Sequence, residues 1–193
     1  MTYKKADHFS RRAQKEGYAA RSVYKLQEMQ QKWKFLKPGQ RVVDLGCAPG
    51  SWSRFAQEQI GFGGVLVGID IQEVAGYPGQ FLQQSIEDTE VDPMRQLLGG
   101  DADVVISDMA PSTTGNRFTD HVRQIALIES GLHLALQLLR PGGSFVAKVF
   151  EGQDAQAFVQ SLRSEFGSVK RFKPKATRGR SVEFFVAGME RKP

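Results

Sequence analysis

The chain has 193 residues, of which 40% are hydrophobic and 24% charged, and these values are typical of one globular domain. Its net charge is +5, its single cysteine excludes an intramolecular disulfide, and no apolar run approaches the roughly 20 residues of a membrane span. Residues 1–12 are basic and polar and lack the apolar core of a signal peptide, so we expect a cytoplasmic protein.

Apolar runs that alternate with helical patterns predict the secondary structure. In chain order we expect a helix at 19–34, a strand at 41–45, a helix at 51–60, strands at 65–69, 81–82 and 104–107, a helix at 119–139, a strand at 144–149, a helix at 155–166, and strands at 169–172 and 182–187. Such alternation is typical of an α/β fold with a parallel, Rossmann-like sheet and right-handed crossovers. We expect a single domain over 1–193, with a basic helical extension at 1–37 and the catalytic core at 38–193.

The ends of the predicted strands indicate a ligand site, because open α/β sheets bind ligands beyond the carboxyl ends of their strands. Gly46 and Gly50 follow the first strand and allow the backbone to turn close to a ligand. Their G-x-x-x-G spacing, with Pro49 inside the loop, departs from the dinucleotide fingerprint G-x-G-x-x-G. The loop is therefore not a dinucleotide site of the usual kind.

S-adenosylmethionine suits this loop better than a dinucleotide. A dinucleotide needs a free helix N-terminus for its pyrophosphate, whereas S-adenosylmethionine has no phosphate and carries a sulfonium cation. Asp70 ends the second strand, where a carboxylate accepts hydrogen bonds from both ribose hydroxyls. The string 44–52 (DLGCAPGSW), followed by Asp70, predicts a methyltransferase that uses this cofactor. Cys47 has no activating His or Cys in sequence, so we interpret it as a packed residue.

Several further motifs resemble those of one known family. They are residues 17–26 (GYAARSVYKL), 44–52, 107–111 (SDMAP), 141–150 (PGGSFVAKVF) and 180–183 (RSVE). Over nearly its whole length the chain resembles the FtsJ family, the ribosomal RNA 2′-O-methyltransferases. The resemblance implies a seven-stranded, mostly parallel methyltransferase sheet. It also implies a catalytic tetrad of Lys25, Asp108, Lys148 and Glu183.

The same resemblance, together with the strand ends, implies the residues that bind the cofactor. They are Asp44, Gly46, Pro49, Gly50, Trp52, Asp70, Ser85 and Asp108. One position departs from the family, which commonly has Gly-Asp-Phe after the third strand. Here Ser85 stands at the place of that Asp, and its hydroxyl can form a hydrogen bond but carries no charge. Asp88, one helical turn further on, is a candidate to compensate.

The tetrad fits the chemistry of a ribose hydroxyl, which is a poor nucleophile near neutral pH. The enzyme must align the ribose oxygen, the methyl carbon and the sulfur. It must also provide a place for the proton that the hydroxyl loses. Lys148 is the candidate general base, or else the group that orients and stabilises the developing alkoxide. A lysine acts as a base only where burial or a second cation such as Lys25 lowers its pKa, and a carboxylate opposes this. Glu183 is expected to position a lysine or the ribose.

The charge distribution indicates a polyanionic partner. Residues 1–37 contain ten Lys and Arg against three Asp and Glu, residues 163–193 nine against three, and residues 38–162 seven against fifteen. A solvated surface gives the same pattern, but both ends share the excess. We expect RNA phosphates to be gripped from one side by Lys4, Lys5, Arg11, Arg12, Lys15 and Arg21, and from the other by Lys170, Arg171, Lys173, Lys175, Arg178 and Arg180.

The resemblance implies a uridine in the A loop of 23S ribosomal RNA, within the large ribosomal subunit, as the target. Alternatives are a tRNA ribose methyltransferase, a base-modifying methyltransferase, a small-molecule methyltransferase and a non-catalytic RNA-binding assembly factor. The segment after the fourth strand lacks the aromatic residue that base-modifying enzymes use to stack a flipped base. We expect no metal site, because the three histidines are far apart in the sequence and have no paired cysteines. We also expect the protein to be a monomer.

Overall fold

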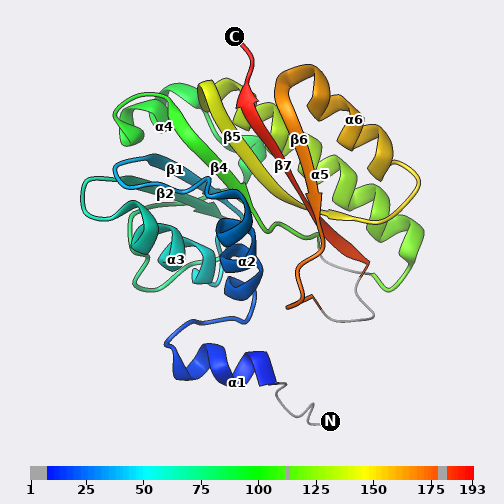
Figure 1. Cartoon of the computed structure of the whole chain (residues 1–193), viewed down its shortest axis with the longest axis horizontal. Coiled ribbons are helices and arrows are strands. Elements are labelled where there is room, and N and C mark those ends of the chain that lie inside the picture. The colour runs from blue at the N-terminus through cyan, green and yellow to red at the C-terminus, as the bar shows by residue number, and fades with distance from the viewer. Residues whose placement is uncertain (1–7, 112–113, 178–181) are drawn as a thin grey trace.

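The computed structural model describes residues 8–111, 114–177 and 182–193, and a seven-stranded sheet forms its centre (Figure 1). The strands are β1 (Arg41–Leu45), β2 (Val65–Asp70), β3 (Gln80–Gln83), β4 (Ala102–Ser107), β5 (Leu139–Phe150), β6 (Phe166–Phe172) and β7 (Glu183–Arg191). Their order is β3-β2-β1-β4-β5-β7-β6. Strands β1 to β5 pair in parallel, and β7 is antiparallel to both β5 and β6. The predicted mostly parallel α/β fold is confirmed.

Helices cover both faces of this sheet. They are α1 (His8–Lys15), α2 (Val23–Trp33), α3 (Ser51–Ile60), the 3-10 helix η1 (Ile86–Asp88), α4 (Val91–Leu98), α5 (Arg117–Leu138) and α6 (Ala155–Glu165). Because successive strand residues point to opposite faces, the sheet separates two cores. Val43 of β1 belongs to the core that contains α4, α5 and α6, whereas Val42 belongs to the core that contains α2 and α3.

The predicted elements all occur, and three further ones accompany them. The sequence did not reveal α1, η1 or α4, because each is short and has at most two buried positions. In α1 only Ala13 is buried, and Pro93 lies within the first turn of α4. Strand β5 also begins earlier than predicted, directly after α5, and includes Pro141, Gly142 and Gly143. None of the helices in the described ranges is long and apolar enough to span a bilayer.

The strand order places a switch point beside β1. From β1 the chain passes outward to β2 and β3 on one side, and then returns to β4 on the other. The carboxyl ends of β1 and β4 therefore open a crevice between diverging connections, which is where ligands bind in such sheets.

Candidate active site

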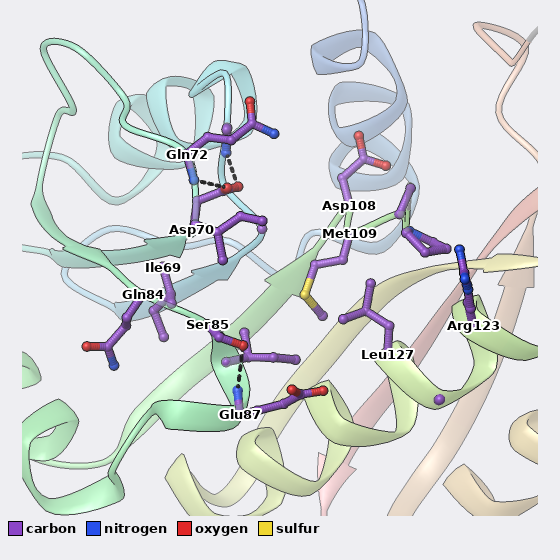
Figure 2. A pocket seen from close by; sticks show the side chains of 17 residues that line it. Ile69, Asp70, Gln72, Gln84, Ser85, Glu87, Asp108, Met109, Arg123 and Leu127 are labelled. Carbon is purple, nitrogen blue, oxygen red and sulfur yellow. Dashed lines mark hydrogen bonds between the residues drawn. The ribbon is translucent and has the colours of Figure 1, made fainter. Parts of the chain in front are cut away.

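A cavity of about 560 Å³ lies at this switch point, a volume suited to a small organic ligand (Figure 2). Its walls come from the loop after β1, the end of β2, the segment 84–87, the segment 108–111 after β4, and α5. Four of the predicted cofactor residues line it: Gly46, Asp70, Ser85 and Asp108.

Asp70 joins the loop after β1 to the end of β2. The backbone N–H of Ala48 donates to its Oδ2 and that of Gln72 to its Oδ1, both at 2.8 Å. Figure 2 shows both hydrogen bonds at the edge of the cavity. Each carboxylate oxygen retains a lone pair that can accept a ligand hydroxyl. The position predicted to bind ribose hydroxyls is therefore held rigidly and faces the cavity.

Met109 crosses the cavity between two glycines. A Cβ added to Gly46 would lie 2.3 Å from Cγ of Met109, and one added to Gly131 of α5 would lie 2.9 Å from its Cε. Gly46 also adopts a φ of +69°, which favours glycine. The first glycine of the loop is thus required both by its backbone conformation and by the side chain that packs on it.

The far wall carries the departure from the family at Ser85. Its Oγ accepts a hydrogen bond from the backbone N–H of Glu87 at 3.2 Å and so caps η1. Glu87 lines the cavity, and Figure 2 shows its side chain running along the lower side of the cavity toward α5. Asp88, expected to compensate for the missing carboxylate, does not line this cavity. The carboxylate at this wall comes from Glu87, because the short 3-10 helix directs the adjacent residue inward.

Asp44 lies beneath the loop and does not line the cavity. It is fully buried, and Oγ of Ser53 donates to its Oδ2 at 2.6 Å, while Oδ1 has no hydrogen-bond partner among the described residues. Burial, together with the nearby charges of Asp108 and Asp70, raises the pKa of Asp44 to about 8 against the opposing hydrogen bond from Ser53. Its role toward the cofactor stays a prediction.

Trp52, Pro49 and Gly50 also lie away from the cavity lining. The indole N–H of Trp52 donates to the backbone oxygen of Ser22 at 3.0 Å, and its ring centroid lies 5.8 Å from that of Phe185. The side chain belongs to the core on the α2 face. Gly50 has a φ of +92° at the start of α3. The predicted cofactor contacts of these three residues remain predictions.

The four tetrad residues form two ion pairs on one face of the sheet. Nζ of Lys148 lies 3.1 Å from Oδ1 of Asp108, and Nζ of Lys25 pairs with Oε1 of Glu183. Phe185 stands between the pairs: it is the β7 partner of Lys148, and Nζ of Lys25 lies 5.6 Å from its ring centroid. The side chains of Lys25 and Lys148 are 11% and 8% exposed, so both ammonium groups sit in a largely dry environment.

Asp108 connects the tetrad to the cavity. Its residue lines the cavity wall, and its backbone oxygen accepts a hydrogen bond from Nζ of Lys148 at 2.6 Å. A ligand in the cavity therefore lies next to the residue that holds this lysine. Among the described residues, no group of three His, Cys, Asp or Glu side chains is arranged to hold a metal ion.

Gln124 of α5 supports the tetrad and was not predicted. Strand β4 ends at Ser107, opposite Ala147, and leaves the next part of β5 without a parallel neighbour. The Gln124 side chain, 1% exposed, fills this place: it donates to the oxygen of Lys148 at 3.0 Å and accepts from the N–H of Phe150 at 3.2 Å. A glutamine on the apolar face of a predicted helix was the signal that could have revealed it.

Comparison with known proteins places these features in a family context. The profile of the FtsJ-like methyltransferases matches residues 18–191. The ribosomal RNA large subunit methyltransferase E of Desulfosudis oleivorans is 50% identical over 98% of this chain and 92% of that protein. The enzyme of the same name from Syntrophobacter fumaroxidans is 47% identical over 98% of both chains. A crystal structure assigned as a ribosomal RNA methyltransferase, from Plasmodium falciparum, has a TM-score of 0.80 at 27% identity and covers 90% of this chain and 98% of its own.

Proposed function

Because the chain belongs to the FtsJ-like methyltransferase family, we propose that it transfers a methyl group from S-adenosylmethionine to a ribose 2′-hydroxyl of RNA. The target we propose is a uridine in the A loop of 23S ribosomal RNA, in the large ribosomal subunit. Relatives that share 43–50% of its residues are named ribosomal RNA large subunit methyltransferase E, which supports ribosomal RNA as the substrate class. The observation that carries the proposal is the position of Asp108, which lines the cavity and also holds Lys148.

The cavity fits the parts of S-adenosylmethionine. The Asp70 carboxylate lines the cavity and can accept hydrogen bonds from the two ribose hydroxyls, and the apolar side chains of Ile69, Ile86 and Leu127 suit the faces of the adenine ring. Acidic walls also suit a cofactor that carries a sulfonium cation and no phosphate. Ser85 and Glu87 supply polar groups at the end where the exocyclic amine of adenine would lie.

The residues of the tetrad then act on the 2′-hydroxyl. Held by Asp70 and the other residues of the cavity, S-adenosylmethionine would supply an activated methyl group, with its thioether sulfur as the leaving group. In this proposal Lys148 orients the hydroxyl and stabilises the negative charge that develops on its oxygen as the proton passes to solvent water. The pair of Lys25 and Glu183, across Phe185, limits where the ribose can sit.

The basic residues support an RNA substrate, although they are not equally accessible. Arg11, Lys15, Lys170 and Lys175 are exposed. Arg12 is bonded to Glu16, and Arg171 is bonded to Glu151 with its guanidinium 3.8 Å from the ring centroid of Phe184. Four candidates lie outside the described residues: Lys4, Lys5, Arg178 and Arg180. RNA contacts made by exposed lysines and arginines weaken as salt is added.

The test is transfer of a labelled methyl group from S-adenosylmethionine to RNA. Large ribosomal subunits from cells that lack the enzyme, naked ribosomal RNA and tRNA are offered in parallel, and nuclease digestion locates the label. We expect label in an alkali-resistant dinucleotide from the large subunit. A label in tRNA would move the target to the tRNA branch, a label on a base would overturn the ribose assignment, and no label on any RNA would favour a small-molecule substrate.

A further inference from the structure

One side of α2, with the turn before it, contacts the region of β6, β7 and their connection. Four charged residues lie at spacings of four, three and four, which places them along a single side of a helix and of the turn before it. They are Arg21, Lys25, Glu28 and Lys32. Each of them contacts a residue of the β6–β7 region more than 130 positions further along the chain.

Glu28 makes the most complete of these contacts. Its Oε2 accepts a hydrogen bond from the backbone N–H of Lys175 at 2.8 Å, and its Oε1 accepts one from that of Ala176 at 2.9 Å. Nη2 of Arg21 donates to the backbone oxygen of Ala176 at 2.8 Å. Both polar backbone groups of Ala176 are thus bonded to the α2 side, and its side chain is buried. Figure 1 shows the chain after β6 running beside α2.

Contacts of Lys32 and Lys25 continue the line of contacts between α2 and the β6–β7 region on both sides of Glu28. Nζ of Lys32 lies 4.5 Å from the ring centroid of Phe172, whose ring also packs against Trp33 at 5.9 Å. At the other end, Lys25 pairs with Glu183 at the start of β7. The two basic ends of the sequence, which we expected to grip RNA from opposite sides, therefore meet along α2, next to one pair of the tetrad.

We propose that Glu28 is a positioning residue that fixes the segment 173–177 on α2, so that lysines from both ends of the chain form one face for RNA phosphates. On that face the exposed Lys32 and Lys34 come from the first end, and the exposed Lys170 and Lys175 come from the second. This face adjoins Lys25 and Glu183, so RNA that binds to it lies next to the tetrad. This inference rests on the proposed RNA substrate.

The direction in which RNA affinity changes when Glu28 is replaced separates the positioning role from a purely electrostatic role. A carboxylate beside bound RNA repels its phosphates, so removal of the charge alone tightens RNA binding. Loss of the two hydrogen bonds to Lys175 and Ala176 releases the segment 173–177, which carries Lys175, and this weakens RNA binding. The two roles for Glu28 thus predict changes in opposite directions.

The experiment compares the wild-type protein with Glu28→Ala and Glu28→Gln. The probe is a transcript of 23S ribosomal RNA that contains the A-loop hairpin, and its dissociation constant is measured over a series of salt concentrations. For Glu28→Ala we expect binding about tenfold weaker, and a salt dependence whose slope is smaller by about 0.7–0.9 for every phosphate that no longer binds a lysine. Glu28→Gln keeps one acceptor oxygen but no charge, so we expect binding between that of the wild type and Glu28→Ala.

Control variants and measurements distinguish failure of the role inferred for Glu28 from failure of the proposed function. Glu58→Ala removes a helix-surface carboxylate that bonds the side chains of Tyr18 and Arg54 and not the segment 173–177, and we expect it to bind RNA no more weakly than the wild type. Affinity for S-adenosylmethionine should be unchanged in every variant, and the KM for RNA should rise more than kcat falls. Tighter or equal RNA binding by Glu28→Ala, or by Glu28→Gln if the alanine variant does not fold, overturns the inference alone. Failure of the wild-type protein to bind or methylate RNA overturns the proposed function itself.

Discussion

Lys148 reaches two oxygen atoms of a single residue, Asp108. Its Nζ lies 3.1 Å from the carboxylate Oδ1 and donates to the backbone oxygen at 2.6 Å. The register of β4 and β5 sets this contact, because Ser107, the last residue of β4, pairs with Ala147, so that Asp108 and Lys148 each follow this pair directly. The ammonium group is therefore held at the border between the cofactor cavity and the tetrad.

Replacement of this lysine should separate catalysis from cofactor binding. We expect Lys148→Ala to lower kcat by about 10² to 10³, the usual contribution of a group that stabilises a developing oxyanion. Lys148 does not line the cavity, so the dissociation constant of S-adenosylmethionine should stay within about twofold of the wild type. Single-turnover methyl transfer and equilibrium cofactor binding measure the two quantities. Near-normal turnover would show that Lys148 has no catalytic role.

Gln124 should matter to catalysis through the backbone of β5. Gln124→Met keeps the approximate volume but leaves the Lys148 oxygen and the Phe150 N–H unpaired. We expect the free energy of unfolding to fall by about 2–4 kcal/mol and kcat to fall about tenfold, with cofactor affinity unchanged. The control is Gln137→Met, at an exposed position of the same helix where the side chain bonds only within α5. Equal kcat values for the two variants would contradict the positioning of Lys148 by Gln124.

Gly46 and Gly39 allow backbone strain to be separated from packing on Met109. Both have left-handed φ values, +69° and +79°, but a Cβ at Gly39 would meet nothing within 4 Å. Either alanine substitution should cost about 1–2 kcal/mol of stability from the backbone alone. Only Gly46→Ala displaces Met109 into the cavity, and we expect its affinity for S-adenosylmethionine to fall about tenfold, equivalent to about 1.4 kcal/mol. Equal cofactor affinities, measured by calorimetry, would refute this.

Asp44 should make the protein less stable as the pH rises. Its pKa is raised to about 8 in the folded state by burial, against about 4 in an unfolded chain, so the folded state holds the proton more tightly. The penalty for ionising the buried group is absent below about pH 4 and complete above about pH 8. We expect the stability difference between Asp44→Asn and the wild type to shift in favour of the variant from pH 5.5 to 7.5, by up to about 1.4 kcal/mol per pH unit.

Chemical denaturation of both proteins at three pH values in this range measures that difference. Comparison with the variant removes the contribution of the other titrating groups, which both proteins share. A difference that does not change with pH would mean that Asp44 ionises normally in the folded protein, despite its burial and its unpaired Oδ1.

Local patterns in the sequence determined the succession of strands and major helices along the chain and the loop around Gly46, whereas the candidates for the tetrad were implied by the resemblance to the FtsJ family. These features depend on side-chain periodicity and on residue types with special backbone or chemical properties, so they can be recognised within short segments. Hydrophobic periodicity did not predict the short helices α1 and α4, because eight residues with one or two buried positions give too weak a periodic pattern.

The tertiary structure alone decided which of these residues meet. Glu28 and Ala176 are 148 positions apart, and Gln124 and Lys148 are 24 apart on different elements, so no local pattern links either pair. It also decided that Trp52 packs against Phe185 in the α2 core and that Glu87, rather than the candidate Asp88, lines the cavity. Such choices follow from how helices pack on a sheet and from which backbone groups that packing leaves to be paired, and these are properties of the whole fold.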